Sequence, residues 1–433
     1  QGTDFVRNTA VGYQALASST ASNNTAVGYE SLLNNTTGTS NVAVGTFALD
    51  ANTTADDNTA VGYFALSNNT TGSQNTGFGR GVMATNTTGS NNTAVGNRAF
   101  ENNTTGTENT AVGANALDAN TTADENTAVG YASLTTNTTG DKNTAVGRST
   151  LFNNTTGSNN VAVGRNTLSS NTTASNNTAI GYESLGANTT GAGNAALGSF
   201  ALSQNTTGHS NTAIGSFSPS TGGSNVIAPM RFNTTGSHNI AVGTGALASN
   251  TTGGFNVTLG NNAGFFITTG NNNLCLGFDA GTTDSPTGAL TTDSNQICLG
   301  NNTHTILKSK ISLTATSDAR DKTDITDFIK GLDIINALRP VTYKWDMRSN
   351  YSNDLSVTPD GSKKSNRTEI GLIAQEVEIV EKANGYSTDE NNQLFIEKST
   401  DGLHYGLKYE RLVPILVNAI KELSTKVTAL EAG

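Results

Sequence analysis

The segment Asn58-Thr59-Ala60-Val61-Gly62 is one copy of a phrase that recurs throughout the first two thirds of the chain. Copies of this phrase end at 17 glycines, which are spaced 17 residues apart without a break from Gly28 to Gly215. A fixed period of this length is typical of a solenoid, in which each repeat forms one coil that contacts mainly its neighbours. The sequence therefore predicts a repetitive β-solenoid fibre domain over residues 1–308.

Each period has two parts that differ in chemistry. The part from Thr59 to Leu66 contains alternating and β-branched residues, which favour one or two short strands with a glycine bend between them. The part that follows, such as Asn69-Thr70-Thr71-Gly72, contains residues that favour turns. Because Gly, Asn and Thr are poor helix formers, we expect mainly β structure.

Each coil offers few apolar side chains: as a rule one Val or Ile before the glycine, one Leu four residues after it, and Ala. Full burial of an aliphatic side chain contributes about 1.5–3 kcal/mol, whereas ordering the backbone costs at least about 1 kcal/mol per residue. Hydrogen bonds between coils, ladders of stacked Asn and a core shared between chains are therefore expected to add stability. We predict a homotrimer, in which small Ala residues allow the chains to approach closely.

The regular spacing is interrupted twice. After Gly215 the next interval is 28 residues and includes Pro219 and Pro229, and the interval from Gly277 to Gly300 is 23 residues. Both insertions are expected to form loops that leave the solenoid. Such loops are candidates for contact with a host receptor, and loops without a partner are the alternative.

Three features of the repeats have two interpretations each. The recurring Asn-Thr-Thr matches the glycosylation sequon, but it also fits a turn within the coil. Cys275 and Cys298 each lie two residues before the repeat glycine, so they are expected to be neighbours, either as a disulfide or as stacked thiols. The four His residues are scattered without ligand spacing, so we expect no metal site and no cofactor. Ions bound on the axis of three symmetric chains remain an alternative.

The composition excludes several classes of protein. The chain has 433 residues, of which only 34% are hydrophobic and 13% are charged, so one large globular core is excluded and two or more domains are expected. Lys and Arg are too few to form a basic surface for nucleic acid, and apolar runs stay below the length of a membrane helix. Gln1 opens no signal peptide, and two Cys residues exclude a disulfide-built scaffold. We therefore expect no nucleic-acid partner and no membrane insertion.

The composition changes after Lys308, and residues 309–433 are predicted to form a small α+β domain. A helix is expected between 327 and 338, a strand over 341–345, a strand or loop leading into a helix over 369–382, and a hairpin strand over 391–398. From Tyr409 onward a long helix carries apolar residues in a heptad pattern. The pattern predicts a coiled coil, with a simple packed helix as the alternative. The heptad residues are Leu416, Ile420, Leu423, Val427 and Leu430.

The junction between the two domains contains Ser317-Asp318-Ala319-Arg320-Asp321-Lys322. A serine hydroxyl becomes a nucleophile when a base removes its proton, and a lysine can be that base when desolvation lowers its pKa. In an extended chain Ser317 and Lys322 would lie about 17 Å apart, so either the segment bends or the lysine comes from another chain. Attack on the carbonyl of Thr316 passes through a five-membered ring, so we place the cut at Thr316–Ser317, with Ser317–Asp318 as the alternative. Arg320 is a candidate oxyanion donor.

Four motifs of this domain resemble the intramolecular chaperone domain of phage tail spikes and fibres, also called the endosialidase C-terminal or S74 peptidase domain. They are Ser317-Asp318-x-Arg320-x-Lys322, Leu338-Arg339-Pro340-Val341-Thr342-Tyr343-Lys344-Trp345, Gly371-Leu372-Ile373-Ala374-Gln375-Glu376-Val377 and Tyr409-x-x-Leu412-Val413-Pro414-x-Leu416. The resemblance implies that Ser317 and Lys322 form a catalytic dyad, with Asp318 and Arg320 in support. Glu381-Lys382-Ala383 departs from the family pattern, in which Pro is common.

The phrase Asn-x-Ala-Val-Gly is similar to the head repeats of trimeric autotransporter adhesins, which form left-handed parallel β-rolls in trimers. A triple-stranded β-helix is the alternative geometry. Together, the two resemblances imply a homotrimeric tail-fibre-like protein of a virion or extracellular appendage that binds a host receptor. Its C-terminal domain would drive trimerisation and folding and leave by a single Ser-Lys self-cleavage, without activity on other substrates. A bacterial trimeric surface adhesin is the alternative, and a glycan-degrading spike is disfavoured because the repeats offer no convincing pair of acidic residues.

Overall fold

The computed structural model describes residues 7–216, 218–219, 226–304, 317, 319–348, 351, 357–386, 393–398 and 405–432. The chain divides into two compact units. The first comprises Gln1–Ala280 and Leu290–Leu299, and the second comprises Gly281–Ala289 and Gly300–Gly433. Within the described ranges, no helix combines the length and the apolar character that crossing a bilayer requires.

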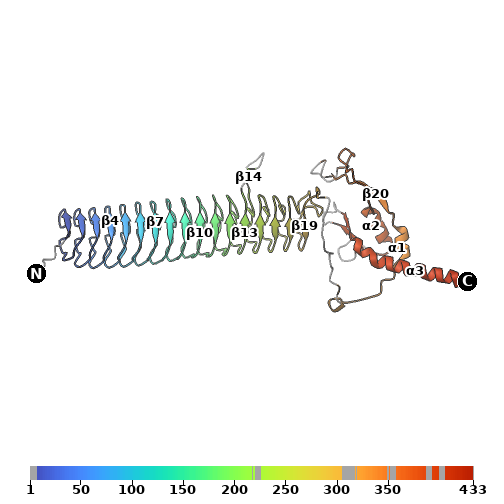
Figure 1. Cartoon of the computed structure of the whole chain (residues 1–433), viewed down its shortest axis with the longest axis horizontal. Coiled ribbons are helices and arrows are strands. Elements are labelled where there is room, and N and C mark those ends of the chain that lie inside the picture. The colour runs from blue at the N-terminus through green and yellow to red at the C-terminus, as the bar shows by residue number, and fades with distance from the viewer. Residues whose placement is uncertain are drawn as a thin grey trace. The chain divides into compact units, whose positions relative to one another are not determined.

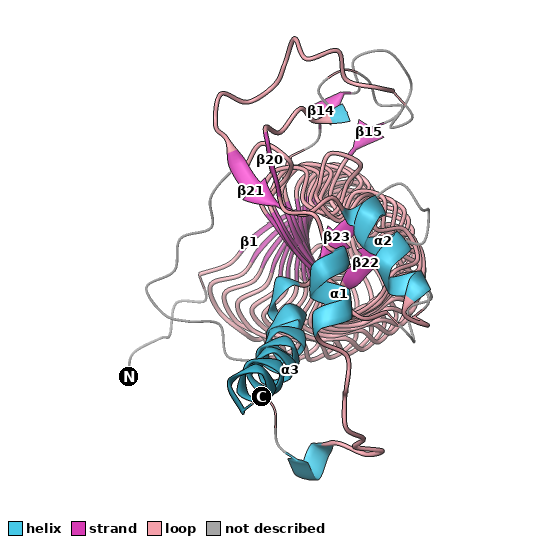
Figure 2. Cartoon of the chain, turned by 90° about the vertical axis from the view of Figure 1, so that its right-hand side faces the viewer, coloured by secondary structure: helices cyan, strands magenta, loops and turns pink. Residues whose placement is uncertain are grey.

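The first unit is a parallel β-solenoid that contributes one three-residue strand per coil to a single 17-stranded sheet, as predicted from the period (Figure 1). Neighbouring strands pair without any shift, so that Ala60 lies opposite Ala43 and Gly77. Viewed along the stack, the strands superimpose on one side of the coil (Figure 2). The strands are β1 (Thr9–Val11), β2 (Thr25–Val27), β3 (Val42–Val44), β4 (Thr59–Val61), β5 (Thr76–Phe78), β6 (Thr93–Val95), β7 (Thr110–Val112), β8 (Thr127–Val129), β9 (Thr144–Val146), β10 (Val161–Val163), β11 (Thr178–Ile180), β12 (Ala195–Leu197), β13 (Thr212–Ile214), β16 (Ile240–Val242), β17 (Val257–Leu259), β18 (Leu274–Leu276) and β19 (Ile297–Leu299).

The described coils have one strand, and the second strand that was considered after the glycine does not form in them. Phe64 and Leu66, which follow Gly62, have positive φ values of 56° and 51°. Left-handed backbone at alternate positions cannot continue an extended strand. The segment after the glycine is therefore a series of turns that leads the chain back across the coil.

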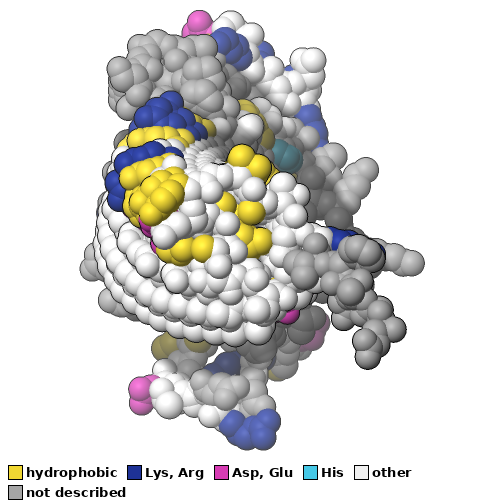
Figure 3. All heavy atoms as spheres, turned by 90° about the vertical axis from the view of Figure 1, so that its left-hand side faces the viewer, with side chains coloured by type: hydrophobic (Ala, Val, Ile, Leu, Met, Phe, Trp, Pro, Cys, Tyr) yellow, Lys and Arg dark blue, Asp and Glu magenta, His cyan; other side chains and the backbone are white. Residues whose placement is uncertain are grey.

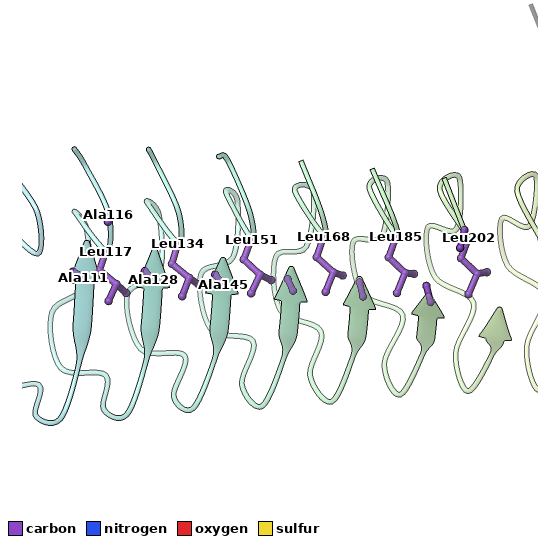
Figure 4. Close-up of a cluster of buried hydrophobic side chains, with 14 of the residues drawn as sticks. Ala111, Ala116, Leu117, Ala128, Leu134, Ala145, Leu151, Leu168, Leu185 and Leu202 are labelled. Carbon is purple, nitrogen blue, oxygen red and sulfur yellow. The ribbon is translucent and has the colours of Figure 1, made fainter. Parts of the chain in front are cut away.

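The interior of each coil is closed by residues of the same chain. The central Ala of the strand and the Leu from the turn segment meet inside the coil, and both are fully buried in coil after coil (Figure 4). Ala60 and Leu66 are examples, each with no exposed surface. Val61 is only partly buried because strand residues alternate and the narrow interior takes only the small Ala. The aliphatic residue before the glycine therefore lies on the outer face of the sheet.

Buried Asn side chains form two ladders that link the coils, as expected. In one ladder, Asn52 Nδ2 donates to Asn35 Oδ1 at 2.9 Å and to the carbonyl oxygen of Ala55 at 3.1 Å. In the other ladder, Asn41 Nδ2 donates to Asn24 Oδ1 at 3.2 Å and also to the Ala55 oxygen at 2.8 Å. Both ladders thus satisfy the same carbonyl group, and they bring hydrogen bonding into an interior that has few apolar atoms.

The repeat glycines permit close stacking of the coils. Gly62 has a φ of +139°, and a Cβ atom there would lie 2.2 Å from the carbonyl oxygen of Gly79 in the next coil. Both the backbone conformation and the missing space require glycine. Seen from the N-terminal end, the surface of the stack is mostly uncharged, and hydrophobic and basic side chains gather along one edge (Figure 3).

The second unit is a small α+β domain, in agreement with the predicted fold class. Its core is formed by Ile334, Val377, Phe395 and Ile415. The sheets are two antiparallel pairs, β20–β21 and β22–β23, and α2 lies against the second pair. The elements are η1 (Ala319–Asp321), α1 (Leu332–Ala337), β20 (Val341–Tyr343), β21 (Glu369–Gly371), α2 (Ala374–Ala383), β22 (Ile396–Lys398), β23 (Tyr405–Leu407), η3 (Tyr409–Arg411) and α3 (Leu412–Ala432).

Candidate functional site

A turn at the start of the C-terminal domain brings Ser317 and Lys322 together. The 3₁₀ helix η1 lies between them, and the backbone N–H of Lys322 donates to the carbonyl oxygen of Ala319 at 3.3 Å. Lys322 Nζ donates a hydrogen bond to Ser317 Oγ at 2.6 Å. The bend therefore occurs within one chain, and a lysine from another chain is not needed to reach this serine.

The two side chains have the geometry of a nucleophile and its base, but both are exposed to solvent. A lysine that accepts a proton must first lose its own, and apolar surroundings promote that loss. The described residues of this chain do not supply such surroundings. Arg320 is also exposed, and the structure does not place it as an oxyanion donor. Thr316 and Asp318 lie outside the described residues.

The two central motifs of the domain contact each other directly. The Arg339 guanidinium forms two hydrogen bonds with the Glu376 carboxylate, of which the one from Nε is 3.0 Å long. This hydrogen bonding holds the pKa of the Glu376 carboxyl below its ordinary value. Next to this ion pair, Val341 of β20 pairs with Gly371 of β21. The motifs therefore build the frame of the domain that follows the Ser-Lys pair.

The motif that begins at Tyr409 joins this frame through the tyrosine itself. Its hydroxyl oxygen accepts a hydrogen bond from the backbone N–H of Leu372 at 3.0 Å. A Cβ atom at Gly371 would lie 2.7 Å from the same hydroxyl, which explains why glycine precedes Leu372. The three motifs thus meet at one place, although they are separated in the sequence.

Glu381, which stood out only as a departure from the family pattern, has a structural role. It is buried, and its carboxylate accepts hydrogen bonds from the backbone N–H groups of Leu394, Phe395 and Ile396 at 3.2, 2.7 and 2.8 Å. It therefore fixes the start of β22 against α2. A glutamate four residues after the buried Val377 lies on the apolar face of its helix, and this spacing was the signal in the sequence.

Helix α3 uses different faces for different contacts. Ile415 and Ala419 are buried in the domain, while Asn418 donates to the carbonyl oxygen of Phe328 and Glu422 accepts from the backbone N–H of Leu332 at 3.3 Å. The predicted heptad residues are all exposed in the single chain. These residues, which we call the α3 stripe, are Leu416, Ile420, Leu423, Val427 and Leu430, with exposed fractions from 43% to 83%.

The solenoid resolves most of the alternatives in the repeats. The Asn residues of the Asn-Thr-Thr segments, such as Asn35, are buried in the ladder, which favours the turn interpretation over glycosylation. Cys275 and Cys298 are paired in register as buried thiols that are not joined in a disulfide. The insertion after Gly215 contains a short antiparallel pair, β14 (Ser218–Pro219) with β15 (Val226–Ile227), that projects from the stack (Figure 1).

Two of the apparently scattered histidines are neighbours. The insertion brings His209 and His238 into adjacent coils, where their ring centroids are 4.8 Å apart. Within the described part of the chain, no group of three or more His, Cys, Asp or Glu side chains is placed to hold a metal ion. His404 lies outside the described residues.

A parallel β-solenoid followed by a compact domain with a Ser-Lys contact at its start fits a fibre-like protein with an intramolecular chaperone. In agreement, residues 317–386 match the model of the peptidase S74 family, described as the chaperone of endosialidase. The family implies self-cleaving peptidase activity and is consistent with a phage-associated extracellular fibre. Searches of curated proteins and of solved structures gave no significant match.

Proposed function

We propose that the protein is a homotrimeric tail-fibre-like protein of a virion or extracellular appendage, which binds a host receptor and is matured by self-cleavage after Thr316. The observation that carries this proposal is the 2.6 Å contact between Lys322 Nζ and Ser317 Oγ within a segment that matches the S74 family. The solenoid is the product of maturation, and the domain after the cut guides its assembly.

Two exposed apolar surfaces support a trimer. The outer face of the long sheet carries a row of aliphatic side chains, among them Val112, Ile180 and Leu259, that are 36–40% exposed in the single chain. At about 4.8 Å per strand, the 17 strands extend this row over roughly 80 Å. The α3 stripe offers a second such surface. Large exposed apolar rows favour contact with other protein surfaces.

The chaperone role follows from the regularity of the repeats. Because neighbouring coils offer nearly the same pairing, a slip by one coil between chains costs little. Chains that first associate through the C-terminal domain and the α3 stripe start in register. The aligned chains then stack coil upon coil. Cleavage removes the domain that aligned them, so a fibre that loses its structure meets a higher barrier to refolding.

The reaction is an acyl transfer followed by hydrolysis. Lys322 takes the proton of Ser317 Oγ, and Oγ forms a bond to the carbonyl carbon of Thr316. The bond from this carbon to the Ser317 nitrogen then breaks, and the nitrogen takes the proton from the lysine. Water hydrolyses the resulting ester, which leaves a carboxylate on Thr316 and a free amine on Ser317. Burial of the pair on association of the chains would provide the desolvation that the lysine needs.

Denaturing gels and intact-mass measurement of freshly expressed chain test the proposal. Cleavage at Thr316–Ser317 gives fragments of 316 and 117 residues from the 433 in the chain. Ser317→Ala and Lys322→Ala should each leave one full-length band that still assembles, while Lys364→Ala, at an exposed lysine in the same domain, should cleave normally. Normal cleavage of both dyad variants would refute the assignment, and a fragment that begins at Asp318 would move the cut.

A further inference from the structure

A groove on the solenoid has no role in the assembly or cleavage described above. It has a volume of about 290 Å³, and Gly81 is one of the residues that line it. Its lining is formed by Asp50, Tyr63, Phe64, Ser67, Asn68, Arg80, Gly81, Ala84 and Glu101. The volume is at the lower end of the range for small-molecule sites, about 300 Å³ and above.

The groove exists because one coil lacks a side chain that its neighbours have. Two residues after the repeat glycine, successive coils place Phe47, Phe64, Gly81 and Arg98 in a row. The rings of Phe47 and Phe64 stack at 4.9 Å, and the row is interrupted at Gly81. A Cβ atom built there would lie 3.5 Å from Glu101 Oε1 and 3.9 Å from Arg98 Cγ. The vacant place is thus bounded by an aromatic ring on one side and by a guanidinium side chain on the other.

The spacing of the coils sets the size of the ligand. Strands are about 4.8 Å apart, so Phe64 and Arg98, which are two coils apart, leave roughly 10 Å between them. One ring lying flat fits this interval, because carbon contacts on each side take about 3.5–4 Å. Two stacked rings do not fit.

The polar lining indicates what kind of ring fits. Asp50 is half-buried as a residue, and its Oδ1 is itself buried and has no hydrogen-bond partner among the described residues. Burial raises the pKa of the Asp50 carboxyl to about 6. Ser67, Asn68 and Glu101 add further polar groups, of which Ser67 and Asn68 each donate to the carbonyl oxygen of Ala84 and Glu101 is paired with Arg98. The positive charges of Arg80 and Arg98 equal in number the negative charges of Asp50 and Glu101. Mixed donors and acceptors with little net charge suit a neutral ligand that carries several hydroxyls.

We propose that the Gly81 groove binds one neutral hexose residue of a glycan. The carbon-bound hydrogens of the sugar ring lie against Phe64, and its hydroxyls bond to Asp50, Asn68 and Glu101. An aromatic face supplies the apolar contact for such a ring, and planar carboxyl and amide groups orient its hydroxyls. This inference rests on the receptor-binding part of the proposed function and gives that receptor a chemical class.

Saturation-transfer NMR on the full chain tests the inference, with the methyl glycosides of glucose, galactose and mannose as probes. At least one glycoside should receive saturation. Gly81→Phe should reduce its affinity at least tenfold, because the new ring fills the vacant place. The variant should fold, since Phe47 and Phe64 occupy the same position with φ values of 59° and 56°, close to the 64° of Gly81. Asp50→Asn, which keeps the shape of the groove, should weaken binding several-fold.

Asn115→Phe is the matched control, because it adds the same ring at the same position two coils further along, outside the groove. It should bind the glycoside as the parent does. The inference is overturned if none of the three glycosides binds, if phenol binds and they do not, or if Gly81→Phe binds as well as the parent. Cleavage and assembly are measured on the same samples, so that loss of sugar binding with normal cleavage refutes the groove alone. Sugar binding without cleavage refutes the proposed maturation alone.

Discussion

Asn103 donates a hydrogen bond from Nδ2 to Oδ1 of Asn86, one coil earlier, at 2.7 Å. Neither side chain is exposed. The same amide also donates to the carbonyl oxygen of Gly106 at 3.0 Å. The interior of the solenoid is therefore stabilised by hydrogen bonds between amide groups as well as by aliphatic packing. When one amide is removed, its buried partner cannot form a hydrogen bond with water instead.

Asn103→Ala should lower the free energy of unfolding by about 1–3 kcal/mol, because it leaves buried polar groups without partners. Asn102→Ala removes the neighbouring, exposed amide and should change stability by less than about 0.5 kcal/mol. Chemical denaturation followed by circular dichroism measures both. Equal losses for the two variants would show that the ladder adds no stability of its own.

Gly130→Ala should be among the most damaging single changes in the solenoid. Gly130 has a φ of +134°, and a Cβ atom would lie 2.5 Å from the carbonyl oxygen of Gly147. We expect local unfolding of the two adjoining coils, visible as faster amide hydrogen exchange there. Gly193→Asn is the control, since Gly193 has a φ of +68° and a Cβ atom there would lie 3.8 Å from the nearest atom, Ser210 Oγ. Unchanged exchange in Gly130→Ala would contradict the close-stacking argument.

The buried Cys275 thiol should make the free energy of unfolding depend on pH under alkaline conditions. Burial, and then the neighbouring Cys298, raises the pKa of the Cys275 thiol to about 12 in the folded chain, against about 8.5 in an unfolded chain. Between these values the unfolded chain loses the thiol proton and the folded chain keeps it. Stability from this group is therefore complete below about pH 8.5 and falls as the pH rises toward 12.

Cys275→Ala, which restores the Ala found in most coils, should show a smaller loss of stability than the parent between pH 9 and 11. Melting temperatures of both chains across this range provide the comparison. The parent thiol should also resist iodoacetamide until the chain unfolds. Parallel pH curves for the two chains would exclude the buried thiol as the cause.

Ile420→Glu should reduce association without harming the fold of one chain. The side chain is 66% exposed in the single chain and belongs to the α3 stripe. A charge there would be buried only on association. Light scattering of the uncleaved Ser317→Ala background should show a trimer, and the double variant should shift toward single chains. Lys421→Glu, which lies beside the stripe, is the control. A trimer that persists in Ile420→Glu would exclude the stripe from the interface.

The coil period and the α+β character of the second domain were predictable, because the first follows from the spacing of the repeat glycines and the second from the spacing of apolar residues. The direction of the strand side chains was not. In Thr59-Ala60-Val61 the alternation allows either face to point inward, and the three residues alone do not decide between the two faces. The coil is narrow, so Ala60 is buried and Val61 is not. The left-handed Leu66 was also beyond prediction, because leucine rarely adopts that conformation outside such packed repeats.

For the junction, the motif resemblance singled out Ser317 and Lys322, and the structure places their reactive atoms in contact. Their catalytic roles stay a prediction. The Gly81 groove could not be anticipated from the repeat, because it arises from a side chain that is missing in one coil. Glu381 was visible as unusual, but its partners Leu394 to Ile396 come from a distant segment of the chain.

Because every coil offers the next one the same register, the shaft is modular. Removal of a whole period, for example residues 131–147, would bring together two surfaces that already match, since Gly130 and Gly147 occupy equivalent positions. Gene segments that encode one period can therefore be duplicated or lost, because the two coils that become neighbours already have matching surfaces. The number of coils therefore sets the length of the solenoid. A protruding pair of strands such as β14–β15 can be inserted in one coil while the neighbouring coils keep their pairing.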